Sequence, residues 1–126
     1  PVAESATSLP ELAPLSDFVL ASAARILQRD TLRQGFWFNE MKPGDVTTLH
    51  SHDDFDELLS AVYYIKVPPE SGHIVFHEND HKKSIPPEEG LFILFSPELK
   101  HEVTENKSQE TRLSIGINIG PSEQEE

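Results

Sequence analysis

Three of the six histidines are spaced as the ligands of one metal ion would be. His50 and His52 are two residues apart, and side chains at that spacing on a β-strand point to the same face. A third imidazole, from His101 on a neighbouring strand, would complete a facial set with positions left open for substrate or dioxygen. Such ligands without sulfur suit Fe(II), Mn(II), Ni(II), Cu(II) or Zn(II). The alternative is that the H-x-H pair is only a polar strand face. The other three histidines are interpreted as surface or rim residues: His73, His77 and His81.

An acidic run follows the histidine pair directly, with four acids in the five positions 53–57. Such a run is typical of a solvated turn, but two metal-binding interpretations stay open. Glu57, at the start of the next predicted strand, could turn inward as a fourth ligand. Alternatively, Asp54 forms an H-x-D pair with His52, which together with His101 would make a two-histidine, one-carboxylate triad.

The elements that position these side chains are short strands. From residue 35 onward the apolar period is two, and the runs are separated by Pro, Gly, Asn and Asp. This pattern predicts an all-β barrel or sandwich rather than a βαβ fold. The predicted strands are 35–41, 47–52, 59–67, 73–77, 82–85, 91–95, 101–103 and 111–119.

One amphipathic helix precedes the strands. Apolar and small residues between Leu15 and Leu27 share a helical face, with Ser16 as the expected N-cap and an end near Arg29 or Asp30. We expect this helix to pack on the outside of a sheet. The predicted organisation is a flexible arm over 1–14, a single domain over 15–119 and an acidic tail over 120–126.

Composition bounds the function. The 126 residues fit one domain, and a net charge of -12 argues against binding to nucleic acid or to anionic membrane surfaces. The absence of cysteine excludes disulfides, thiolate zinc sites and cysteine nucleophiles. No apolar run approaches a transmembrane span and no signal peptide opens the chain, so a cytoplasmic protein is expected. Because the first residue is Pro1, the chain can be a trimmed form or part of something longer.

Two stretches resemble the motifs of the cupin superfold. Gly44-x5-His50-x-His52-x4-Glu57 resembles the first cupin motif. The second is a degenerate match from Gly90 to His101, with a leucine where a glycine is usual. This resemblance implies a double-stranded β-helix, a small jelly-roll barrel with a metal in its mouth.

A closer resemblance, from about Gly35 to Asn118, is to the bacterial 2-oxoglutarate-Fe(II) oxygenases related to prolyl hydroxylases. In that family a histidine and a carboxylate near the second strand hold iron together with a later histidine. The resemblance implies that His101 is the later ligand and that His50 and His52 are the earlier pair, unless Asp54 serves. The stretches that carry it include 36–39, 43–45, 49–52, 60–68, 71–76, 89–90, 94–95, 101–103 and 111–112.

Arg112 strengthens the oxygenase interpretation. Arg112 and Ser114 share a face of the predicted last strand, and a guanidinium can bind a carboxylate through two parallel hydrogen bonds. Many family members grip the distal carboxylate of 2-oxoglutarate with this R-x-S spacing, and Tyr64 matches a tyrosine that bonds the same carboxylate. The alternative for Arg112 is a surface salt bridge to one of the 22 acidic residues.

The resemblance therefore implies an Fe(II)- and 2-oxoglutarate-dependent dioxygenase that hydroxylates a small molecule or a peptide side chain. One alternative is a cupin-type metal-binding protein or metalloenzyme without 2-oxoglutarate, which would use His50, His52, Glu57 and His101. Another is a binding module without enzymatic activity on the same barrel. A homodimer could form through an edge strand such as 35–41.

Overall fold

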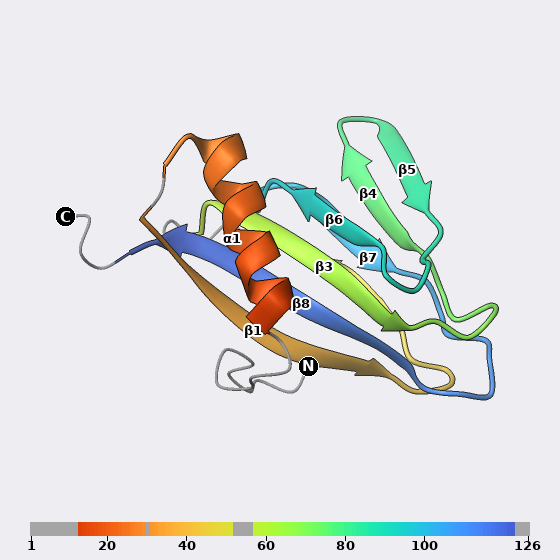
Figure 1. Ribbon diagram of the computed structural model, residues 1–126. Helices are drawn as coiled ribbons and strands as arrows, with labels where there is room; N and C mark the ends of the chain where they lie inside the picture. The colour runs from red at the N-terminus through yellow and green to blue at the C-terminus, as the bar shows by residue number, and fades with distance from the viewer. Residues whose placement is uncertain (1–12, 30, 52–56, 123–126) are drawn as a thin grey trace.

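The protein is described by a computed structural model covering residues 13–29, 31–51 and 57–122. In these ranges one helix precedes eight strands that form two four-stranded antiparallel sheets (Figure 1). The elements are α1 (Ala13–Leu27), β1 (Leu32–Met41), β2 (Thr47–His50), β3 (Leu59–Lys66), β4 (Ile74–Glu78), β5 (His81–Ile85), β6 (Phe92–Phe95), β7 (Lys100–Val103) and β8 (Arg112–Pro121). Of the arm predicted over 1–14, residues 1–12 lie outside the described residues, as does the end of the tail, 123–126. Ala13 and Pro14 belong to α1, so the boundary predicted between arm and domain was two residues too late.

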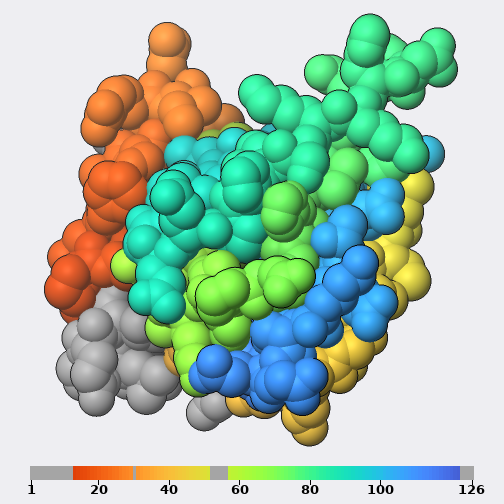
Figure 2. Space-filling model, turned by 90° about the vertical axis from the view of Figure 1, so that its right-hand side faces the viewer, coloured from red at the N-terminus to blue at the C-terminus, as the bar shows by residue number. Residues whose placement is uncertain are grey.

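The strands alternate between the two sheets along the chain. One sheet has the order β1-β8-β3-β6 and the other has the order β2-β7-β4-β5. Only the β4–β5 hairpin keeps two successive strands in one sheet, and in the space-filling view it projects from the body of the molecule (Figure 2). This topology is the double-stranded β-helix, or cupin-like jelly roll, that the resemblance to cupins implied, and it confirms the all-β fold that the strand pattern predicted.

The predicted helix is present, but its start was placed wrongly. α1 begins at Ala13, so Ser16 lies inside the first turns rather than at the N-cap. Gln34 of β1 donates its side-chain N–H groups to the carbonyl and the hydroxyl of Ser16. Serine is typical of an N-cap, but Ser16 instead accepts hydrogen bonds from a strand of the sheet. Within the described ranges, no helix has the length and apolar character needed to span a membrane.

The first and last strands are longer than predicted because they pair with each other along their whole length. Their register runs from Leu32 opposite Pro121 to Met41 opposite Arg112. β8 therefore takes in the first two residues of the predicted acidic tail. The second strand ends at His50, and His52, predicted as its last residue, lies outside the described residues.

The period-two pattern of β8 divides the protein into two apolar layers. Ile115, Ile117 and Ile119 are fully buried on the face that α1 covers (Figure 1). A second cluster has side chains from both sheets, with Met41, Ile74, Phe76 and Val103 as its buried members. Arg112, Ser114 and Gly116 alternate with the isoleucines, so they point away from α1 and into the space between the sheets.

Candidate active site

A cavity of about 350 Å³ lies between the two sheets. Strands β2 and β7 of one sheet and β1, β3 and β8 of the other supply most of its walls. Trp37 of β1 is one of the residues that line it. The remaining lining residues are Asn39, Thr47, His50, Ala61, Val62, Tyr64, Ile74, Phe95, His101, Val103, Arg112, Ser114 and Gly116.

His50 and His101 meet on one side of this cavity. They are paired residues of β2 and β7, and their ring centroids lie 4.3 Å apart. His50 Nδ1 lies 2.8 Å from the carbonyl oxygen of Thr48, and His101 Nδ1 lies 3.1 Å from that of Leu99. Because a carbonyl only accepts, Nδ1 is the donor in each contact, and Nε2 is the nitrogen that could bind a metal ion. A backbone carbonyl commonly orients metal-binding histidines in this way.

Aromatic side chains enclose His101, which is only 5% exposed. The ring of Phe95 contacts it edge-on at a centroid distance of 4.9 Å, and Phe76 lies at 5.9 Å. These apolar walls restrict the movement of the imidazole and keep water away from one side of the site. His101 is thus placed by packing as well as by its hydrogen bond.

The sequence also predicted His52 as a metal ligand, together with Glu57 or Asp54. His52 and Asp54 lie outside the described residues. Glu57 accepts a hydrogen bond from the hydroxyl of Ser60 and is not among the residues that line the cavity. Among residues 13–29, 31–51 and 57–122, no three His, Asp or Glu side chains are grouped as metal ligands. The described part of the chain thus brings His50 and His101 together and leaves the third ligand open.

The remaining histidines lie outside the cavity walls. His73 and His81 are exposed, as expected for rim residues. His77 is half-buried and pairs with Glu102 of the neighbouring strand β7. Because His77 lies on β4, pairs with Glu102 and does not line the cavity, it is a useful control for metal-binding experiments.

Arg112 lies at the cavity wall and is only 2% exposed, so the alternative of a surface salt bridge is wrong. Its Nη1 donates a hydrogen bond to Met41 Sδ at 3.2 Å, and its Cζ lies 4.9 Å from the centroid of the Tyr64 ring. Its Nε has no hydrogen-bond partner within the described ranges. Burial lowers the pKa of Arg112, and the neighbouring Tyr64 opposes this shift only in part.

Tyr64 is 1% exposed, and its hydroxyl also has no hydrogen-bond partner among the described side chains. Burial raises the pKa of Tyr64, although the positive charge of Arg112 acts in the opposite direction. Ser114, paired with Tyr64 in the β3–β8 register, is buried on the same wall. Arg112, Tyr64 and Ser114 were therefore correctly expected to lie together.

Sequence reasoning missed the contact between Arg112 and Met41. The alternation of β1 could have placed Met41 on the same inward face as Trp37 and Asn39. No local pattern, however, indicates that a sulfur on the first strand meets a guanidinium on the last.

A protein-family model matches residues 35–118, and the family is described as "Putative 2OG-Fe(II) oxygenase". No curated protein sequence matches the chain.

Solved structures share the fold at low identity. A prolyl-4-hydroxylase from Pseudomonas putida is 21% identical with a TM-score of 0.67, over 83% of this chain and 65% of that one. An oxidoreductase of the 2OG-Fe(II) oxygenase family from Burkholderia pseudomallei is 16% identical with a TM-score of 0.74, over 89% and 59%. HygX from Streptomyces hygroscopicus, solved with iron bound, is 14% identical with a TM-score of 0.77, over 97% and 72%. This chain thus spans less than two-thirds of the length of the first two.

Proposed function

The chain belongs to the 2OG-Fe(II) oxygenase family whose model it matches over residues 35–118, and from that premise we propose that it is a 2-oxoglutarate-dependent Fe(II) oxygenase. The proposed reaction is hydroxylation of a small molecule or a peptide side chain. The observation that carries the proposal is the buried guanidinium of Arg112, which has no ion-pair partner among the described residues and faces the cavity that His50 and His101 line.

The wall formed by Arg112, Tyr64 and Ser114 fits a carboxylate. A buried charge without a counter-ion is unfavourable, so an anion that enters the cavity relieves a free-energy cost already present in the ligand-free protein. The guanidinium can donate two parallel hydrogen bonds to one carboxylate. The hydroxyl of Tyr64, which has no other partner in the described structure, can donate a further one.

His50 and His101 fit a metal ion because backbone carbonyls orient both rings through Nδ1, so Nε2 is the nitrogen that would bind the metal. We propose these two as iron ligands together with His52, with Asp54 as the alternative third ligand. Three imidazoles would leave the iron more positively charged than two imidazoles and a carboxylate. When bound, Fe(II) would supply dioxygen activation coupled to oxidative decarboxylation of 2-oxoglutarate.

The chain itself would orient the co-substrate and exclude water. The carboxylate-binding wall belongs to β3 and β8 of one sheet, whereas the histidines belong to β2 and β7 of the other. A dicarboxylate held at one end by Arg112 can therefore present its other end to the metal. Apolar side chains that line the same cavity, including Val62, Ile74 and Phe95, would help to keep it dry.

The test is a titration of the anaerobic, Fe(II)-loaded protein with 2-oxoglutarate, followed by visible absorption. We expect a metal-to-ligand charge-transfer band in the wild type and its loss in His101→Ala. His77→Ala is the matched control, since His77 pairs with Glu102 and is not a cavity residue, and it should keep the band. Stoichiometric iron without a band in the wild type would contradict the proposal and favour a cupin-type metalloprotein.

A further inference from the structure

The guanidinium of Arg112 is oriented by sulfur rather than by oxygen. Met41, the only methionine of the chain, is the last residue of β1 and stands opposite Arg112 in the β1–β8 register. It is 2% exposed, and its Sδ accepts a hydrogen bond from Arg112 Nη1 at 3.2 Å. The hydroxyl of Thr47, a cavity residue, lies 4.0 Å from the same sulfur. Met41 therefore sits where an acceptor for the arginine is needed.

The chemistry of this acceptor decides how much positive charge the cavity retains. A thioether is a weak and uncharged acceptor, so it can fix the direction of one N–H without neutralising the guanidinium. A carboxylate at the same place would form a buried ion pair with Arg112 and would compete with any incoming anion. The Met41 sulfur thus satisfies one N–H of Arg112 and leaves its charge for a ligand.

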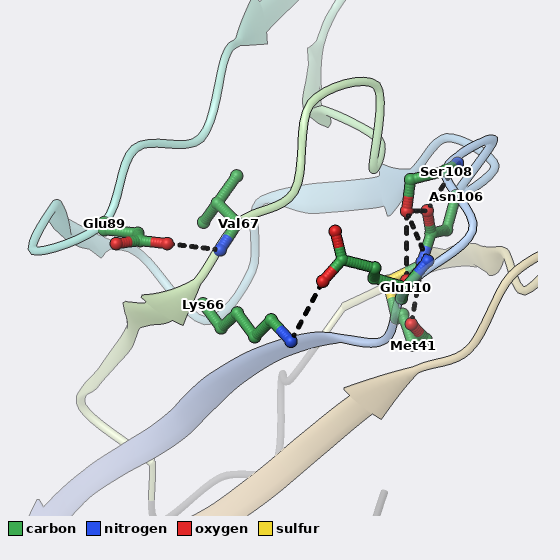
Figure 3. Close-up of polar contacts among 7 residues, drawn as sticks. All are labelled: Met41, Lys66, Val67, Glu89, Asn106, Ser108 and Glu110. Atoms are coloured by element: carbon green, nitrogen blue, oxygen red, sulfur yellow. Dashed lines mark hydrogen bonds and ion pairs between the residues drawn. The ribbon is translucent and has the colours of Figure 1, made fainter.

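Met41 is itself fixed by a buried asparagine. Asn106 is fully buried, and its Nδ2 donates to the carbonyl oxygens of Met41 and Glu110, each at 2.9 Å (Figure 3). Its Oδ1 accepts from the backbone N–H and the hydroxyl of Ser108 at 2.9 and 2.7 Å. Asn106 therefore joins the end of β1 to Glu110, which lies two residues before Arg112 in the segment that leads into β8.

We propose that Met41, anchored by Asn106, is a positioning residue that orients the guanidinium of Arg112 for a carboxylate ligand while leaving its positive charge uncompensated. This inference rests on the proposed function, since the carboxylate is taken to be that of 2-oxoglutarate. Met41, which does not line the cavity, would thus help Arg112 to bind an anion.

Three variants separate this role from simple packing. Met41→Leu keeps an apolar side chain of similar size but removes the acceptor. Met41→Gln supplies a neutral acceptor of similar length, and Met41→Glu supplies a charged one. If Met41 only filled space, leucine would be the best replacement and the two polar residues the worst.

We expect the affinity for 2-oxoglutarate to depend instead on whether residue 41 offers Arg112 a neutral hydrogen-bond acceptor. Binding of 2-oxoglutarate to the anaerobic Fe(II) protein, measured by calorimetry, should weaken about tenfold in Met41→Leu, which is the loss of one hydrogen bond. Met41→Gln should stay within about threefold of the wild type, and Met41→Glu should lose about a hundredfold or more. Thermal unfolding of the ligand-free variants should rank them differently, with leucine above glutamine, so binding and stability give opposite orders.

A second readout needs no substitution at Met41. In protein labelled with 13C at the methionine methyl group, the Met41 methyl resonance should shift on saturation with 2-oxoglutarate and should also be displaced in Arg112→Leu. This measurement keeps the proposal testable even if Met41→Glu does not fold.

The outcomes distinguish a failure of the proposed function from a failure of the role proposed for Met41. Wild-type protein that binds iron but no 2-oxoglutarate contradicts the proposed function and overturns this inference with it. Wild-type binding that Met41→Leu retains in full, with a Met41 methyl resonance that Arg112→Leu does not move, overturns the role of Met41 alone.

Discussion

The imidazole rings of His50 and His101 face each other at 4.3 Å across β2 and β7, and both are oriented through Nδ1 by backbone carbonyls. The buried Arg112, for which we propose a role in carboxylate binding, belongs to the other sheet. The candidate site is therefore assembled from two sheets that contribute different chemistry. A ligand that needs both must bridge the space between them, which is what a short dicarboxylate can do.

Replacing Arg112 should abolish binding of 2-oxoglutarate and raise the stability of the ligand-free protein. Arg112→Met removes a buried charge that has no counter-ion in the described ranges and keeps most of the side-chain volume. We expect the free energy of unfolding of the ligand-free protein to rise by about 1–4 kcal/mol, as urea denaturation would measure. Added 2-oxoglutarate should stabilise the Fe(II)-loaded wild type further but leave the variant unchanged. A variant that is less stable than the wild type without ligand would show that Arg112 supports the fold itself.

Tyr64→Phe should weaken binding of 2-oxoglutarate with little loss of ligand-free stability at neutral pH. The hydroxyl has no hydrogen-bond partner in the described structure, so its removal leaves no group unsatisfied. We expect an affinity about tenfold lower by calorimetry.

The same substitution should change the alkaline limb of the stability curve. Burial raises the pKa of Tyr64 in the folded protein, so the folded state favours the protonated phenol. Its contribution is fully present below the unfolded pKa of about 10 and is lost as pH rises through the folded value. Above about pH 10 the wild type should lose stability more steeply than Tyr64→Phe in urea titrations. Identical slopes would contradict a buried, neutral Tyr64.

Short-range patterns predicted most of the fold. The strand predicted over 111–119 correctly placed Arg112 and Ser114 on one face, because side chains on a strand alternate between its two faces. The cap-like Ser16 misplaced the helix start, since a serine in the first turns can equally serve a partner such as Gln34 from another element. Tertiary contact overrode the local preference there.

Contacts between distant segments could not be predicted from the sequence. Met41 and Arg112 are 71 residues apart, and only the β1–β8 register brings them together. Asn106 gave no sequence signal, because an asparagine before a polar segment resembles an ordinary turn residue. The shared location of Arg112, Tyr64 and Ser114 was predicted from resemblance and strand alternation, and their binding role stays a prediction. The residues that contact Arg112 from other strands depend on how the strands pair.

Glu57→Gln tests whether the metal site includes the carboxylate of the cupin alternative. Glu57 accepts a hydrogen bond from Ser60, and glutamine can keep that acceptor. If Glu57 lies outside the metal site, Fe(II) affinity should stay within about threefold of the wild type, a change below the worth of one hydrogen bond. A loss comparable to that of His101→Ala would establish Glu57 as a ligand. The iron content that remains after dialysis against a competing chelator compares Glu57→Gln and His101→Ala directly.

Gly116 and Trp37 offer a direct optical report on the cavity. They are opposite each other in the β1–β8 register, and a Cβ at position 116 would overlap the indole ring. Gly116→Ala should therefore destabilise the protein by about 1–3 kcal/mol and displace the indole within the cavity. Because Trp37 is the only tryptophan, a shift in the emission spectrum and weaker binding of 2-oxoglutarate should accompany this loss.

Gly90→Ala is the matched control: its positive φ of 87° makes alanine costly there as well, but no side chain lies within 4 Å. It should lower stability while leaving the Trp37 emission and the 2-oxoglutarate affinity as they are in the wild type. An unchanged spectrum in Gly116→Ala would mean that the cavity wall can shift at β1 without moving the indole.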